Sequence, residues 1–92
     1  MYIYIYIYTS KVTLLFFAKS REIIGHKEAR LHIPSASTGR HILKYIVKAY
    51  PELNLIANNL VLSLNEEYLE LDRQVTLQEN DEIAVIPPIS GG

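Results

Sequence analysis

Residues 37–51 read Ser-Thr-Gly-Arg-His-Ile-Leu-Lys-Tyr-Ile-Val-Lys-Ala-Tyr-Pro, and their apolar side chains recur at helical spacing. One flank of such a helix can pack on a sheet, while Lys44 and Lys48, one turn apart, face solvent. Ser37 or Thr38 can cap the start of the helix, and Pro51 ends it. The segment therefore predicts one main amphipathic helix. Its apolar positions are Ile42, Leu43, Ile46, Val47 and Tyr50.

Two β-rich segments precede this helix. Val12 to Phe17 is mostly apolar, which is typical of a central strand that is buried on both faces. Lys27 to Ile33 alternates apolar and polar residues, which indicates a half-exposed strand. Between them, Ala18 to Ile24 is compatible with a short helix, and Gly25 suits the left-handed conformation that often ends one. We expect the two strands to pair in a hairpin-like unit.

Three further short strands are predicted after the helix. Leu60 to Leu64 is an apolar run, and residues 65–69 supply a turn and a second strand. Glu82 to Ile86 follows the polar turn at residues 78–81 and indicates a last, mostly buried strand. The order β, β, α, β, β, β predicts an α+β fold, with a mixed sheet of four to five strands packed on one main helix. This is the element order of the β-grasp, or ubiquitin-like, fold.

The composition limits the class of protein. Ninety-two residues suit a single domain, and nine Lys and Arg residues against ten Asp and Glu residues are an ordinary globular balance. No basic stripe follows the chain, which argues against a nucleic-acid binder. The chain has no cysteine, which excludes a disulfide scaffold, a thiolate nucleophile and a Cys-ligated metal. We expect a cytosolic protein that has no membrane segment.

The chain begins with a Tyr/Ile repeat that is too short to span a bilayer and lacks the basic start of a signal peptide. We interpret residues 1–11 as a low-complexity extension, with an added edge strand as the alternative. Residues 12–86 then form the β-grasp domain, and residues 87–92 form an extended tail.

The chain offers no metal, phosphate or acid/base motif. His26, His32 and His41 lack metal-ligand spacing, so we predict no metal site. Gly39 alone does not make a phosphate-binding loop. The adjacent carboxylates at residues 66–67 lie in a predicted turn, where we expect them to be solvated.

The tail reads Pro-Pro-Ile-Ser-Gly-Gly, and its two prolines lack the N–H groups that a sheet ladder needs. At about 3.1 Å per residue, six extended residues reach roughly 18 Å, far enough to enter a partner's pocket. Glycines at the end have no Cβ, so they can pass a narrow channel and present the terminal carboxylate. The tail residues are Pro87, Pro88, Ile89, Ser90, Gly91 and Gly92.

The terminal carboxylate is the candidate reacting group. A free carboxylate resists nucleophiles because of its negative charge, and attaching AMP turns one oxygen into a good leaving group. The terminal carboxylate would therefore have to be activated before it reacts with a nucleophile. The alternative is a frayed terminus with two glycines that have no role, because chain ends are commonly disordered.

Three blocks of the chain match one family pattern. They are Phe-Phe-Ala-Lys-Ser-Arg-Glu-Ile-Ile-Gly at 16–25, Asn-Asp-Glu-Ile-Ala-Val-Ile at 80–86 and Pro-Pro-Ile-Ser-Gly-Gly at 87–92. With these blocks the chain resembles the small, sulfur-carrying subunit family of molybdopterin synthase, a ThiS-like and ubiquitin-related group. The resemblance covers residues 12–92, and the Tyr/Ile extension has no counterpart in the family pattern.

The resemblance implies a non-catalytic sulfur carrier. Gly92 would be adenylated by a ubiquitin-activating-type enzyme, which consumes ATP, and the glycyl adenylate would then be sulfurated to a thiocarboxylate. The tail would enter the large catalytic subunit and give its sulfur to cyclic pyranopterin monophosphate, within a 2+2 heterotetramer. No cofactor would be bound permanently, and the catalytic lysines would belong to the large subunit. Phe17 and Ile86 would contribute apolar contacts to the partners, although both are also compatible with plain core residues.

Three other functions share the predicted fold. They are a sulfur carrier for thiamine synthesis or tRNA thiolation, a protein modifier joined to lysines, and a ubiquitin-like binding module. The tail Pro-Pro-Ile-Ser-Gly-Gly favours the molybdopterin interpretation, because the tails of the carriers and modifiers resemble it mainly in the final glycines. A binding module would not need Gly92 to be last.

Overall fold

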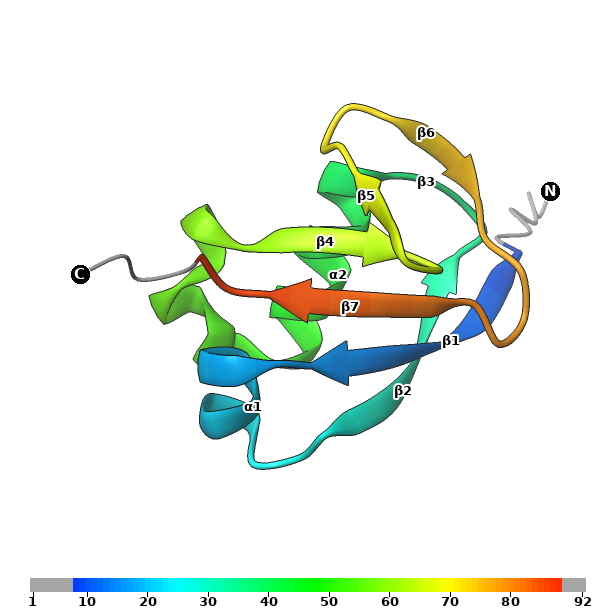
Figure 1. The fold of residues 1–92 in the computed structure, drawn as a ribbon. Coiled ribbons are helices and arrows are strands. Elements are labelled where there is room, and N and C mark those ends of the chain that lie inside the picture. The colour runs from blue at the N-terminus through cyan, green and yellow to red at the C-terminus, as the bar shows by residue number, and fades with distance from the viewer. Residues whose placement is uncertain (1–7, 89–92) are drawn as a thin grey trace, which may run out of the picture.

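The computed structural model describes residues 8–88 of the chain (Figure 1). The predictions for residues 1–7 of the Tyr/Ile repeat and for Ile89, Ser90, Gly91 and Gly92 lie outside the described residues.

A five-stranded mixed sheet forms one layer of the molecule, as predicted. Its strand order is β2-β1-β7-β4-β5, with β1 and β7 parallel at the centre and the other neighbouring pairs antiparallel (Figure 1). With one main helix against it, this is the β-grasp arrangement. The strands are β1 (Thr9–Phe16), β2 (Glu28–Pro34), β4 (Val61–Leu64), β5 (Glu67–Leu69) and β7 (Glu82–Ile86).

The helix α2 (Gly39–Ala49) forms the second layer and lies behind the sheet in Figure 1. Ile42 and Ile46 are fully buried against the core, and each such side chain contributes about 1.5–3 kcal/mol by leaving water. The Oγ1 of Thr38 accepts a hydrogen bond from the N–H of His41 at 3.1 Å, so Thr38 is the N-cap. The predicted amphipathic helix and its bounds are confirmed.

The hairpin-like unit is also confirmed. β1 and β2 pair antiparallel, with Val12 opposite Leu31 and Leu14 opposite Ala29 on the inner face. Between them α1 (Ala18–Ile24) ends at Gly25, whose φ of 84° is the left-handed conformation that its position predicted. The first strand begins at Thr9, three residues earlier than predicted, because the ladder to β2 continues to Pro34.

Two short strands and two 3-10 helices were not predicted. β3 (Ala36–Thr38) and β6 (Gln74–Thr76) pair as a separate two-stranded sheet, at the far upper edge of Figure 1. The 3-10 helices η1 (Pro51–Leu55) and η2 (Ala57–Asn59) connect α2 to β4. Leu53 of η1 is fully buried, so this connection helps to close the core.

The core lies between the sheet and α2. The rings of Phe16 and Tyr50 meet edge to face, with centroids 5.5 Å apart. No helix within residues 8–88 is long and apolar enough to cross a membrane. The fully buried apolar residues are Val12, Leu14, Ile33, Ile42, Ile46, Leu53, Leu62, Ile83 and Val85.

Candidate functional site

The central strand β7 leads directly into the tail. It is held on one side by β1 and on the other by β4, so its end is fixed by ladders on both sides. β7 ends at Ile86, so the chain leaves the sheet at Pro87, which is buried, while Pro88 is exposed. Because proline lacks the N–H of a ladder, the prediction that the chain leaves the sheet here agrees with the structure. The remainder of the tail lies outside the described residues.

A buried serine ties the end of β7 to the start of α1. The Oγ of Ser20 lies 2.9 Å from the carbonyl oxygen of Val85 and 2.7 Å from that of Phe17, to which its hydroxyl can donate. The same Oγ accepts the N–H of Phe17 at 3.0 Å. Ser20 is 0 % exposed, so its hydroxyl is shielded from water. Its hydrogen bonds hold Phe17 beside the tail exit, which is the point after Ile86 where the chain leaves the sheet.

An apolar face covers the outer side of the sheet next to the tail exit. Val61 lies opposite Ile86 in the β4–β7 ladder, and their chain neighbours Leu62 and Val85 face the core. Side chains alternate along a strand, so Val61 and Ile86 point outward. We call this surface, formed by Leu15, Phe17, Val61, Tyr68 and Ile86, the apolar face.

Phe17 and Ile86 therefore lie together on this face. Phe17 keeps an extended backbone, with φ −124° and ψ 149°, so it continues the alternation of β1 and points away from the core. It is 48 % exposed, which contradicts the alternative that Phe17 is a core residue. Ile86 is half-buried in the same outer layer. The role of both residues in partner contact stays a prediction.

Sequence reasoning missed three members of the apolar face, which are Leu15, Val61 and Tyr68. Val61 is 37 % exposed and Tyr68 is 63 % exposed, although each lies in a predicted strand. The alternation of side chains along β4 and β5 could have indicated that Val61 and Tyr68 point outward, because their chain neighbours Leu62 and Leu69 are buried. The strand register that brings Val61 opposite Ile86 is a tertiary property that one sequence does not show.

The described residues offer no metal site and no acid/base pair in a pocket. Within residues 8–88, no three His, Asp or Glu side chains gather closely enough to hold a metal ion. His26, His32 and His41 are exposed and come from a loop, β2 and α2 respectively. Glu66 and Glu67 are both exposed, as predicted, but only Glu66 lies in the β4–β5 turn, because Glu67 begins β5.

Comparison with known proteins identifies the family of the chain. The chain matches the ThiS family over residues 14–92. It is 43% identical over 88 residues to the molybdopterin synthase sulfur carrier subunit of Aedes aegypti, covering 89% of each chain. It is 41% identical over 83 residues to the protein of the same name from Homo sapiens, covering 89% of this chain and 94% of the human one.

Solved structures show the same fold. The H. volcanii small archaeal modifier protein 1 superposes with a TM-score of 0.72 at 22% identity, covering 87% of this chain and 99% of that one. A chain from a Helicobacter pylori complex of subunits 1 and 2 of molybdopterin-converting factor superposes with a TM-score of 0.60 at 20% identity. That match covers 89% of this chain and 99% of the H. pylori chain.

Proposed function

The chain belongs to the ThiS family, and on that premise we propose that it is the sulfur carrier subunit of a molybdopterin synthase. The observation that carries the proposal is the match, over most of both chains, to relatives that bear this name. The geometry supports it, because the central strand β7, which precedes the tail, ends beside an exposed apolar face.

The working group in this proposal is the carboxylate of Gly92. One carboxylate oxygen attacks the α-phosphorus of ATP on the activating enzyme, pyrophosphate leaves, and a glycyl adenylate forms. The outer sulfur of that enzyme's persulfide then displaces AMP and forms an acyl disulfide. A second thiol attacks the enzyme's sulfur of this acyl disulfide, so that a disulfide forms and the thiocarboxylate is released. The carrier donates this sulfur to cyclic pyranopterin monophosphate, and two such transfers make one dithiolene. The carrier binds no cofactor permanently and supplies no catalytic side chain.

In this proposal the outer face of the sheet binds the partner, and the tail enters the partner's pocket. The apolar face is the surface that we assign to partner binding, because exposed aromatic and aliphatic side chains next to a functional group are typical of an interface centre. Phe17 and Ile86 belong to it. The tail, residues 87–92, then threads into the partner's pocket, where glycines at its end keep it thin.

Two partners follow from this function. The first is the large catalytic subunit, in an assembly of two large and two small subunits. The H. pylori structure is a complex of subunits 1 and 2 of molybdopterin-converting factor, which supports a pairing of this kind. The second is a ubiquitin-activating-type adenylyltransferase and sulfurtransferase. We place all three in the cytosol, and we assign no nucleic acid or membrane partner.

The proposal differs from a plain binding module in what it requires of Gly92. A variant that carries one extra residue after Gly92 still folds and still binds the large subunit, because the apolar face is unchanged. It fails to support molybdopterin formation, because the carboxyl group of Gly92 is then part of a peptide bond and cannot be adenylated. The measurement is molybdopterin formed in a reconstituted reaction with the activating enzyme and the large subunit.

The matched control inserts the same residue within the extension, between Tyr4 and Ile5, where the proposal predicts full activity. Molybdopterin formation by the variant extended after Gly92 at the wild-type rate would contradict the carrier role. A thiamine or tRNA-thiolation carrier would instead be charged with sulfur at Gly92 and give no molybdopterin with the large subunit.

A further inference from the structure

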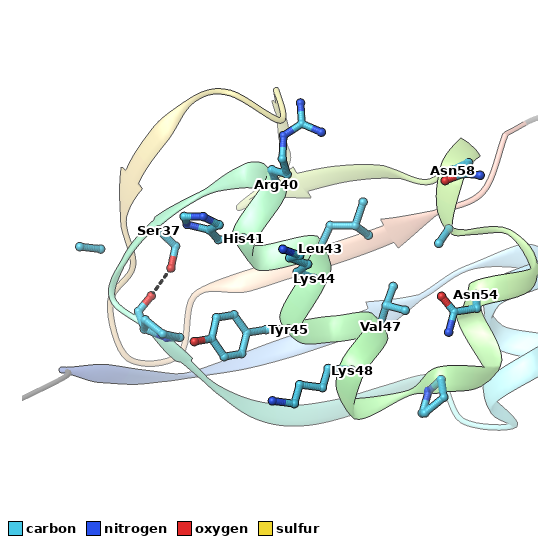
Figure 2. Close-up of a pocket in the computed structure, with 14 residues that line it drawn as sticks. Ser37, Arg40, His41, Leu43, Lys44, Tyr45, Val47, Lys48, Asn54 and Asn58 are labelled. Atoms are coloured by element: carbon cyan, nitrogen blue, oxygen red, sulfur yellow. Dashed lines mark hydrogen bonds between the residues drawn. The ribbon is translucent and has the colours of Figure 1, made fainter.

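An open groove of about 1150 Å³ runs along the side of α2 that faces away from the sheet (Figure 2). Its walls come from α2, from three residues around the β2–β3 connection and from four residues of the 3-10 segment. Outside α2 the lining residues are Pro34, Ala36, Ser37, Pro51, Asn54, Ala57 and Asn58. Ile42 and Ile46 point to the core, so the groove is formed by the opposite side chains of the helix. No step of the proposed sulfur transfer uses this groove.

The groove is basic. Arg40, Lys44 and Lys48 line it, and neither α2 nor the groove lining contains an Asp or Glu residue. Three of the chain's nine Lys and Arg residues thus line this groove, although the chain as a whole carries a net charge of −1. Arg40 pairs with Asp72 at 3.1 Å, whereas within residues 8–88 neither Lys44 nor Lys48 forms a salt bridge. We call this surface the basic groove.

The basic groove also carries apolar and amide groups. Leu43 and Val47 are half-buried and lie on the same side of the groove, as Figure 2 shows, and Tyr45 is 40 % exposed. Asn54 and Asn58 are exposed at the 3-10 rim, where side-chain amides can both donate to and accept from a peptide backbone. An apolar floor with a few polar groups at its rim is typical of a surface that binds a peptide.

We propose that the basic groove binds an acidic peptide segment of a partner protein, with apolar residues interspersed among its carboxylates. Charge complementarity selects the acidic side chains, and Leu43 and Val47 select the apolar ones. The chain's own segment 1–7 is not the occupant, because it contains no acidic residue. Three Lys and Arg residues on a chain of net negative charge are too few for firm binding to nucleic acid or an anionic membrane.

The groove and the apolar face lie on opposite layers of the molecule, so both can be occupied at the same time. The acidic segment would hold the partner to the protein from the helix side while the sheet and the tail remain accessible. This inference does not rest on the proposed sulfur transfer, because it uses only the charge and shape of α2 and its surroundings.

The test uses the full-length ¹⁵N-labelled protein and the peptide acetyl-Asp-Glu-Leu-Asp-Glu-Leu-Asp-Glu-amide as probe. We expect shifts in the amide signals of α2 and residues 51–58 at low salt, with those of β4, β5 and β7 unchanged. Lys44→Glu lowers the affinity on the order of tenfold, and Lys44→Arg retains it. The matched control is Lys27→Glu, because Lys27 is exposed and lies outside the groove lining.

Four outcomes would overturn the proposal. One is equal affinity of the Lys44→Glu and Lys27→Glu variants for the peptide, and another is a set of shifts confined to the apolar face. A peptide with Asn and Gln in place of Asp and Glu should not bind, and equal binding would contradict the charge argument. Tighter binding to phosphatidylglycerol vesicles or to poly(U) RNA than to the peptide would assign the groove to a different class of partner.

Discussion

Gly39 begins α2 at a point where the backbone of residues 70–71 leaves no room for a side chain. A Cβ at this position would overlap the carbonyl oxygen of Glu70 and come within 3.0 Å of the Cα of Leu71. Two backbone hydrogen bonds hold these segments together. The N–H of Gly39 donates to the carbonyl oxygen of Arg73 at 3.1 Å, and the N–H of Arg40 donates to that of Leu71 at 2.7 Å. Gly39 therefore serves close packing between the helix start and the β5–β6 connection.

The change Gly39→Ala should therefore destabilise the protein. The overlap is with backbone, which cannot rotate away as a flexible side chain can, so the expected loss is about 1–3 kcal/mol in the free energy of unfolding. Urea denaturation at equilibrium measures it. The control Ala49→Gly at the exposed end of the same helix should cost no more than about 1 kcal/mol. A Gly39→Ala variant as stable as the wild type would contradict the packing argument.

Local sequence rules predicted some residue roles and left others open. Both Ser37 and Thr38 were acceptable caps, and the structure selects Thr38 because the Oγ of Ser37 donates to the carbonyl of Pro34 at 2.6 Å. The packing role of Gly39 could not be predicted, because residues 70–71 approach it only in the folded chain. The buried contacts of Ser20 were missed for the same reason, since Val85 is 65 positions away.

The β4–β5 turn is the element whose backbone departs most clearly from what its side chains prefer. Asn65 has φ 49° and Glu66 has φ 71°, the left-handed values that a two-residue hairpin turn requires. Asn tolerates this conformation, and its side chain also anchors the turn by accepting the N–H of Glu82 at 2.9 Å. Glu66 makes no such compensating side-chain bond within residues 8–88.

Replacing Glu66 by Gly should stabilise the hairpin. Gly adopts the left-handed conformation without the energetic cost that an L-residue has there, but it also has more conformational freedom in the unfolded chain. The expected net gain in the free energy of unfolding is about 0.5–1 kcal/mol. Thermal and urea unfolding measure it. Glu67→Gly is the matched control, because Glu67 lies in β5, where Gly weakens the strand. A loss of stability in the Glu66→Gly variant would show that the turn is not strained at this residue.

At the level of elements, the sequence predicted the segments that carry a clear apolar pattern, and β5 after its turn, but it missed the short strands β3 and β6. β1, β2, β4, β7 and α2 each have at least four residues with clear patterning. β3 and β6 have three residues each, too few to show a period, and they pair across a separation of 36 to 40 positions. Their pairing depends on the tertiary fold, which brings the two segments together.

At the level of the whole molecule, the tail leaves one end of a sheet whose outer side is apolar, while the helix side is basic. The change Val61→Asp places a charge in the apolar face next to Ile86. It should weaken binding to the large subunit on the order of tenfold or more, because a charge at an interface centre loses its water without gaining a partner. Isothermal titration with the large subunit measures the effect.

The control for this prediction is Thr76→Asp, an exposed strand position on the separate β3–β6 sheet. It should leave the affinity unchanged. Equal affinities of the two variants for the large subunit would place the docking surface elsewhere.

The tail could be predicted from the sequence because its prolines and glycines are adjacent in the chain. The apolar face could not, because strand register assembles it from β1, β4, β5 and β7.

Sulfur transfer through Gly92 is tested most directly by an intact and fragment mass spectrum of the protein co-expressed with its activating enzyme. Oxidation of Met1 to its sulfoxide adds nearly the same nominal mass as exchanging oxygen for sulfur, so C-terminal fragments must locate the change. We predict one sulfur in place of one oxygen at Gly92. An unmodified Gly92 in the presence of a demonstrably active enzyme would contradict the carrier function and favour a ubiquitin-like binding module.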